Sequence, residues 1–375
     1  MIAALFLLCL LLPDIGFAED LQKGAQELIA ALELEALGKA AAESGWFEEG
    51  IVQVLGRLAS GQMVLSAQDV LNRLMSQAAG AFQNSVRRMT RMMIPALLSA
   101  CSQWLSDPKA AAGKAARYAG LLMTMMLLVT DLREHTALCS QTVSRMAGWM
   151  QALFPVLVTL LAAVGGTASS AFYQPAVMAA AGSMTTLVEH ITMPLAVGVA
   201  MLTMVGGLSE NLRVSRLCRL LRQAASWTLG FGFTVFLGVM TVQGLSSAAL
   251  DGVSIRTAKY AVDHFIPIVG GMFADTVDTL VGCSLVVHNA VGVLGLILLL
   301  SALLMPILRT VMTLFLYRTC AAVLEPVADG PLCRAIGGYA DVFSLLFVIQ
   351  LSVGAMFLLL VAQLLVVGNV TVMLR

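Results

Sequence analysis

Long apolar runs constrain this sequence more than any other feature. One of them, residues 281–304, contains no Asp, Glu, Lys or Arg and exceeds the roughly 20 residues that a helix needs to cross a bilayer. Hydrophobic residues make up 59% of the chain and charged residues only 12%, about half the roughly 25% charged residues of a soluble domain. The pattern predicts an all-α fold, a polytopic membrane helical bundle with seven to nine spans or re-entrant segments. The candidate spans are residues 92–106, 118–131, 146–166, 171–188, 190–208, 227–249, 281–304, 306–324 and 341–367.

Three of these runs are atypical for membrane-crossing helices. Runs 92–106 and 118–131 are short for a bilayer, and Pro95 interrupts the first, so the pair is interpreted as a re-entrant hairpin. Run 306–324 contains two arginines, which are costly where they face lipid. It is therefore expected to be a broken or half-buried helix.

The N-terminus has the pattern of a signal peptide, assigned to residues 1–18. An apolar core at 2–12 is followed by helix-breaking residues, and Gly16 and Ala18 are small residues at the positions typical of cleavage before Glu19. A basic n-region is missing, so the alternative of an uncleaved anchor stays open. In either case the following segment is expected to begin outside the cytoplasm.

Residues 19–90 are the sizeable polar part of the chain and are predicted to form an extracytoplasmic helical domain. Leucines recur there with helical spacing at positions 21, 28, 32 and 37. Its first half is rich in Asp and Glu, which indicates either a solvated helix face or a docking surface for a partner. Residues 91–375 are assigned to the polytopic transmembrane domain.

Several functional classes have no signature in this chain. The formal net charge is zero, so no overall basic field predicts binding to nucleic acid. None of the seven cysteines forms a C-x-x-C pair, which leaves neither a disulfide framework nor a metal site to predict. Phosphate loops, H-E-x-x-H and G-x-S-x-G are missing as well. We expect no enzyme activity, no catalytic residue, no cofactor and no metal.

The stretch NLRVSRLCRLLRQ, residues 211–223, places Arg213, Arg216, Arg219 and Arg222 at every third position. On a helix these arginines cover about half of the circumference, and apolar residues cover most of the rest. A voltage sensor needs such a pattern inside a spanning helix, and a nucleic-acid site would leave the apolar half exposed. We interpret the stretch as a short amphipathic cytoplasmic helix that lies against anionic lipid and can contact a cytoplasmic partner.

A second polar segment lies at residues 264–297, near a membrane span. Its members of interest are Gly270, Gly271, Asp275, Asp278, His288 and Asn289. Ionisable groups at such a depth usually face a bundle interior or a water-filled path. The segment is therefore a candidate path or assembly cluster, and the alternative is a polar membrane boundary with a hydrogen-bonded histidine.

Four Gly-Gly pairs lie near the edges of apolar runs. Such pairs are typical of helix ends and close helix packing, and the alternative is broken helices that line a path. The pairs are Gly165-Gly166, Gly206-Gly207, Gly270-Gly271 and Gly337-Gly338.

The segment PIVGGMFADTVDTLVGCSLVVHNAVGVLGLI, with LTMVGGLSENLRVSRLCRLLRQAASWTLGFGFTVFLGVMTVQG upstream, resembles the stage III sporulation protein AE family of endospore-forming Firmicutes. The resemblance covers roughly residues 90–370, and its most specific part is the P-h-V-G-G-x-x-x-D-x-x-D-T pattern. The layout of signal peptide, helical extracytoplasmic segment and many spans is similar too.

The resemblance implies a role in sporulation. Proteins of this family belong to an eight-protein mother-cell membrane complex that includes a cytoplasmic ATPase and acts with sporulation stage II protein Q of the forespore. The implied function is a permease-like subunit of a channel or secretion-like conduit that supports late forespore gene expression. A membrane scaffold and a free-standing secondary transporter remain the alternatives. The resemblance implies a multi-pass protein of the mother-cell membrane around the forespore.

Overall fold

The computed structural model describes most of the chain. The described residues are 19–32, 34–45, 47, 50–62, 67–105, 111–208, 214–265, 270–326 and 330–373. The predicted signal peptide lies outside them. Every described element is helical, which confirms the all-α fold class.

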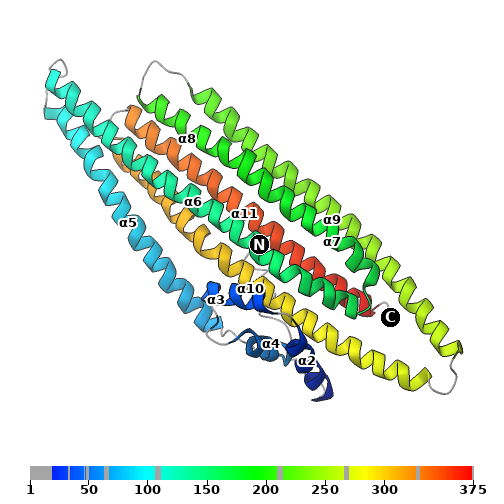
Figure 1. The fold of residues 1–375 in the computed structure, drawn as a ribbon. Coiled ribbons are helices and arrows are strands. Elements are labelled where there is room, and N and C mark those ends of the chain that lie inside the picture. The colour runs from blue at the N-terminus through cyan, green and yellow to red at the C-terminus, as the bar shows by residue number, and fades with distance from the viewer. Residues whose placement is uncertain are drawn as a thin grey trace.

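Three short helices precede a bundle of long ones (Figure 1). The short helices are α2 (Glu19–Ala31), α3 (Glu35–Ser44) and α4 (Ile51–Ala59). The long elements are α5 (Ala67–Leu105), α6 (Ala111–Ala163), α7 (Thr167–Leu187), the π-helical segment η1 (Val188–Thr192), α8 (Met193–Leu208), α9 (Ser215–Phe265), α10 (Gly270–Leu324) and α11 (Gly330–Met373). Consecutive long rods run up and down the bundle, and the 53 residues of α6 extend about 80 Å at 1.5 Å per residue.

Within the described residues, five helices are long and apolar enough to cross a membrane, and they indicate a membrane protein. They are Tyr118–Ala163, Val177–Gly207, Ser215–Gln243, Thr279–Leu324 and Leu332–Met373. The expected seven to nine spans are not confirmed, because neighbouring apolar runs join into single helices. Between the two runs of α6, Asp131 and His135 contact α10, Arg133 and Arg145 are exposed, and the helix continues through all four residues.

Prolines inside the apolar runs do not end the helices, whereas three of the four Gly-Gly pairs lie at or beside helix ends. Pro95 lies inside α5 and Pro306 inside α10, as is tolerated where neighbouring helices and side chains satisfy the freed carbonyls. Gly165, with φ of 106°, forms the turn between α6 and α7. Gly337 and Gly338 instead lie inside the continuous helix α11, so the described chain has no helix break at this pair.

The end of α5 and the start of α6 form a helical hairpin, which projects beyond the neighbouring helices in Figure 1. Its outer faces carry exposed apolar side chains, among them Ile94, Leu98, Leu122 and Met126. These are the segments predicted as a re-entrant hairpin. The hairpin geometry is present, and insertion into a membrane stays a prediction.

Helices α2, α3 and α4 pack against the bundle, mainly against α6 and α10. The Trp149 indole N–H of α6 donates a hydrogen bond of 3.4 Å to Glu43 of α3. Buried side chains such as Ile29 and Leu55 belong to the same apolar core as the long helices. Helix α5 also runs through the predicted domain boundary at residue 90, so the division into two domains stays a prediction.

Helices α10 and α11 pack against each other more extensively than any other described pair, and we call their contact the glycine seam. At Gly292 of α10 the space for a side chain is filled by Leu365 of α11, and at Gly354 of α11 it is filled by Leu303 of α10. Each helix thus receives a leucine from the other at a glycine. Small residues allow this close approach of helix backbones in a membrane protein.

Candidate functional site

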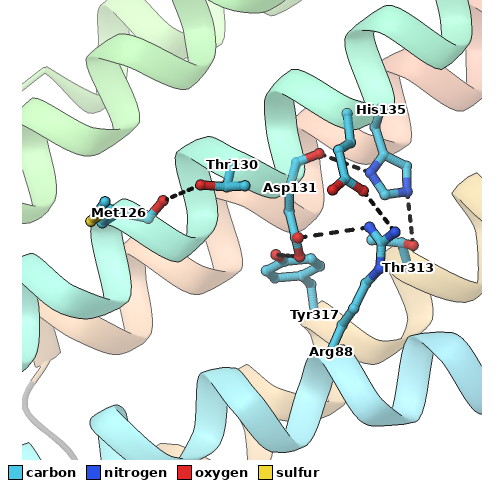
Figure 2. Close-up of polar contacts among 8 residues, drawn as sticks. Arg88, Met126, Thr130, Asp131, His135, Thr313 and Tyr317 are labelled. Carbon is cyan, nitrogen blue, oxygen red and sulfur yellow. Dashed lines mark hydrogen bonds and ion pairs between the residues drawn. The ribbon is translucent and has the colours of Figure 1, made fainter.

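A network of polar side chains crosses the apolar bundle where α5, α6 and α10 meet (Figure 2). We call it the Asp131 cluster, and its members are Arg88 of α5, Asp131, Glu134 and His135 of α6, and Thr313 and Tyr317 of α10. Asp131, Glu134 and His135 follow a spacing of three and four residues, which places them on one face of a helix.

Arg88 and Asp131 are the charged centre of this cluster. The Arg88 guanidinium lies 2.7 Å from the Glu134 carboxylate and 3.7 Å from the nearer oxygen of Asp131. The other Asp131 oxygen accepts a hydrogen bond of 2.7 Å from the Tyr317 hydroxyl. Because Asp131 is 22% exposed and Glu134 is 54% exposed, the network leads from the bundle surface into its core.

His135 links the charged centre to the core. Its Nδ1 lies 2.9 Å from the Asp131 backbone carbonyl oxygen and its Nε2 lies 3.0 Å from the Thr313 hydroxyl. A carbonyl can only accept, so in the neutral imidazole Nδ1–H donates and Nε2 accepts from Thr313. Phe343 of α11 contacts the His135 ring edge-on and stacks on Tyr317, each with ring centroids 4.9 Å apart. The aromatic contacts hold both polar rings in place.

A small cavity of about 10 Å³ adjoins these residues, and its polar lining includes Ser85, Arg88, Asp131, Thr313 and Tyr317. This volume is close to the minimum that one water molecule requires. The Arg88 Nη1 is buried there without a hydrogen-bond partner in the described chain, and its 3.7 Å separation from Asp131 is too long for a direct hydrogen bond. The geometry therefore suits one bridging water.

The segment predicted as a path or assembly cluster begins α10. Gly270 and Gly271 are its first residues, and Asp275 and Asp278 follow in the first turns, with side chains outside those that the structure describes. His288 is ten residues after Asp278 on the same helix, a rise of about 15 Å. The structure therefore does not bring the two aspartates and the histidine together at one point.

His288 and Asn289 lie at the far end of the glycine seam. The His288 ring is fully buried, and a Cβ at Gly368 of α11 would lie 2.7 Å from it. Asn289 and Asn369 exchange side-chain hydrogen bonds of 3.1 and 3.4 Å between the two helices. Paired amides of this kind satisfy polar groups between membrane helices, and the contact joins α10 to the end of α11.

The arginine stretch differs from the prediction of a separate short helix. Arg216, Arg219 and Arg222 lie in the first turns of α9, which continues without a break into an apolar span, and Arg213 lies outside the described residues. No proline or glycine separates the basic turns of α9 from the first apolar turns, so the helix continues from one into the other. Arg222 forms an ion pair of 2.9 Å with Asp341 of α11.

The Asp131 cluster was not predicted from the sequence. Runs 118–131 and 146–166 were predicted as separate spans, whereas the residues between them form the middle of α6. The spacing of Asp131, Glu134 and His135 was the signal that could have revealed a helical polar face. In the described part of the chain, no three His, Cys, Asp or Glu side chains are placed to share a metal ion.

Comparisons with known proteins agree with the resemblance in the sequence. The family model for stage III sporulation protein AE matches residues 51–368. Stage III sporulation protein AE of Bacillus subtilis (strain 168) is 34% identical over 257 residues, which cover 68% of this chain and 64% of the relative. The match thus spans just under two thirds of the relative's length. No solved structure matches the chain. A family match over most of the sequence, together with a helical membrane bundle, shows that this chain belongs to the stage III sporulation protein AE family.

Proposed function

We propose that this chain is the permease-like membrane subunit of a multi-protein channel between mother cell and forespore, needed for endospore formation and late forespore gene expression. It acts in the mother-cell membrane around the forespore. Its partners are the other membrane proteins of the stage III sporulation A complex, their cytoplasmic ATPase and, indirectly, sporulation stage II protein Q. The family is a sporulation family and not a known enzyme family, so no reaction is proposed.

The Asp131 cluster is the observation that supports a conduit role. Ionisable side chains within membrane helices are costly, and they usually mark a path for ions, protons or polar substrates. Here a cation, two carboxylates and an imidazole meet between three helices beside a cavity of about 10 Å³. A water-sized space next to charged groups is a natural starting point for a path that widens when the helices separate.

The glycine seam favours a second candidate, a scaffold that anchors other subunits without lining a path. Leucines seated at Gly292 and Gly354 leave no space between α10 and α11. Separating α10 from α11 at the seam would break closely packed apolar contacts and form no new ones. In the conduit model the path therefore opens on the Asp131 side of α10, and in the scaffold model it does not open.

Asp131→Asn separates the two candidates because it removes the charge and keeps the shape of the side chain. We would measure a late forespore reporter and the co-isolation of complex partners in sporulating cells of the native host. If the chain is a conduit, reporter activity is lost while the partners still co-isolate. If it is a scaffold, reporter activity and co-isolation are either both kept or both lost. Arg133→Gln is the matched control, since Arg133 is an exposed charged residue on the same helix and is not a member of the cluster.

The pair Asp275→Asn and Asp278→Asn tests the predicted segment at the start of α10. If these carboxylates line a path, the double substitution lowers the reporter while the complex still assembles. If they only support assembly, the partners no longer co-isolate. An unchanged reporter with normal assembly would remove both residues from the candidate site.

A further inference from the structure

Helix α9 presents an exposed apolar stripe along one face, with side chains repeating at close to four residues. Trp227 and Phe231 are each 73% exposed, which is unusual for aromatic side chains in a folded protein. The members of the stripe are Leu220, Trp227, Phe231, Val235, Val239 and Val242. From Leu220 to Val242 the helix rises about 33 Å, close to the roughly 30 Å thickness of the hydrocarbon core of a bilayer.

Arginines from α9, α10 and α11 lie near the Leu220 end of this stripe. Asp341 of α11 lies 2.9 Å from Arg222 of α9 and 4.0 Å from Arg318 of α10. Arg334 precedes Asp341 by seven residues, two turns earlier on the same helix face. We call this set the arginine junction, and its arginines are Arg216, Arg219, Arg222, Arg318 and Arg334.

The arginine junction carries an excess of positive charge. Among the described residues at this end, the five arginines outnumber two carboxylates, Asp341 and Glu325, which leaves a formal charge of 5 − 2 = +3. Helices α9 and α11 begin at this end and α8 and α10 end there, so the helix dipoles largely offset one another and the field comes from the arginines. Arg216, Arg219 and Arg334 are exposed, and Arg318 is 63% exposed, so an anion can reach them.

We propose that the arginine junction binds the phosphate groups of anionic phospholipids, and that the hydrocarbon core covers α9 from Leu220 to Val242. Guanidinium groups bind phosphate oxygens in a bidentate manner, which suits them to a lipid headgroup. The apolar stripe starts directly beside the arginines, which fits a lipid that offers a phosphate and an acyl chain together. A free phosphate ion would use the arginines and leave the stripe without a partner.

The test uses the full chain in nanodiscs and the fluorescence of Trp227, isolated as the difference between the wild type and Trp227→Phe. Discs contain phosphatidylcholine with a fixed fraction of either brominated phosphatidylglycerol or brominated phosphatidylcholine, because bromine quenches a neighbouring indole. Stronger quenching by brominated phosphatidylglycerol is the expected result. Equal quenching by both lipids would overturn the headgroup assignment. No quenching by either lipid would show that protein covers α9, and would overturn the proposal as a whole.

Substitutions then test the arginines. Each arginine near a membrane surface contributes roughly fivefold in attraction to anionic lipid, so Arg219→Gln with Arg334→Gln should lower the preference for phosphatidylglycerol severalfold. Arg133→Gln with Arg145→Gln on α6 is the matched control, because both residues are exposed but lie outside the junction. An unchanged preference in the first pair would contradict the proposal. Loss of the preference on adding inorganic phosphate at millimolar concentration would assign the site to a free anion instead.

Discussion

The glycine seam and the Asp131 cluster hold the same helix, α10, in opposite ways. At the seam, Leu365 and Leu303 fill the space above Gly292 and Gly354, so close apolar packing joins α10 to α11 at these positions. At the cluster, Tyr317 and Thr313 join α10 to α6 through hydrogen bonds beside an ion pair. When two closely packed apolar surfaces separate, their side chains lose contacts that nothing of matching shape replaces. A polar contact can exchange its partners for water. The comparison predicts that α10 moves with α11 and parts from α5 and α6.

The largest effect should come from filling the seam. Gly354→Val forces its side chain against Leu303, whose Cγ would lie 2.9 Å from the new Cβ. We expect a loss of about 3 kcal/mol of stability, the upper range of overpacking. The measurement is thermal unfolding of the full chain in detergent, followed by reaction of the buried cysteines with a thiol-reactive dye.

Two further variants define this result. Adding Leu303→Ala to Gly354→Val should restore much of the stability, since it vacates the space that the valine needs. Gly148→Val is the matched control, because a Cβ at Gly148 would meet nothing within 4 Å. If Gly148→Val destabilises as much as Gly354→Val, the seam is not held by shape.

Removing the cation from the Asp131 cluster should have the next largest effect. Arg88→Gln leaves two carboxylates without their common partner, and hydrogen bonds to charged groups contribute about 1.5–3 kcal/mol. We expect a loss of about 2 kcal/mol and faster labelling of Cys320, which lines the adjoining cavity, in the folded protein. Arg87→Gln, at the exposed neighbouring position, should change neither quantity. Equal effects of the two substitutions would argue against a specific ion pair.

A smaller effect is expected from Tyr317→Phe. The substitution removes the 2.7 Å hydrogen bond to Asp131 and keeps the ring that stacks on Phe343. A single hydrogen bond contributes about 1 kcal/mol, so the unfolding temperature should fall only slightly. The cluster would prove to be held by packing instead if Tyr317→Leu were no worse than Tyr317→Phe.

The smallest effect should come from the amide pair at the end of the seam. Asn369→Leu leaves Asn289 without its partner, and hydrogen bonds between membrane helices contribute about 0.6 kcal/mol on average. Adding Asn289→Leu removes the remaining unpaired amide and should recover part of the loss. A double variant that is worse than the single one would mean that the pair contributes more than a local contact.

The sequence predicts the helical membrane fold well because apolar runs are a local property of the chain. It does not predict where such runs join. In α6, Asp131 and His135 between the two runs face α10, and only the packed bundle shows that no loop is needed. The Asp131 cluster could not be predicted either, because Arg88, Asp131 and Tyr317 are far apart in the chain and meet only in the packed bundle. His288 and Asn289 could be identified locally, but their partners Gly368 and Asn369 could not.

Water is expected to reach α10 at the Asp131 cluster and not to enter the packed core where α6 meets α11. Silver ions are about as small as water and bind thiols, so they can probe native cysteines in the complex isolated from sporulating cells. Cys320 of α10 lines the cavity, and the Cys139 thiol of α6 lies 3.9 Å from the Leu346 carbonyl oxygen of α11; both cysteines are buried. Protection from later alkylation in denaturant, read by mass spectrometry, reports which thiol silver reached. The account predicts that Cys320 is protected and Cys139 is not. Equal protection of both, or of neither, would contradict it.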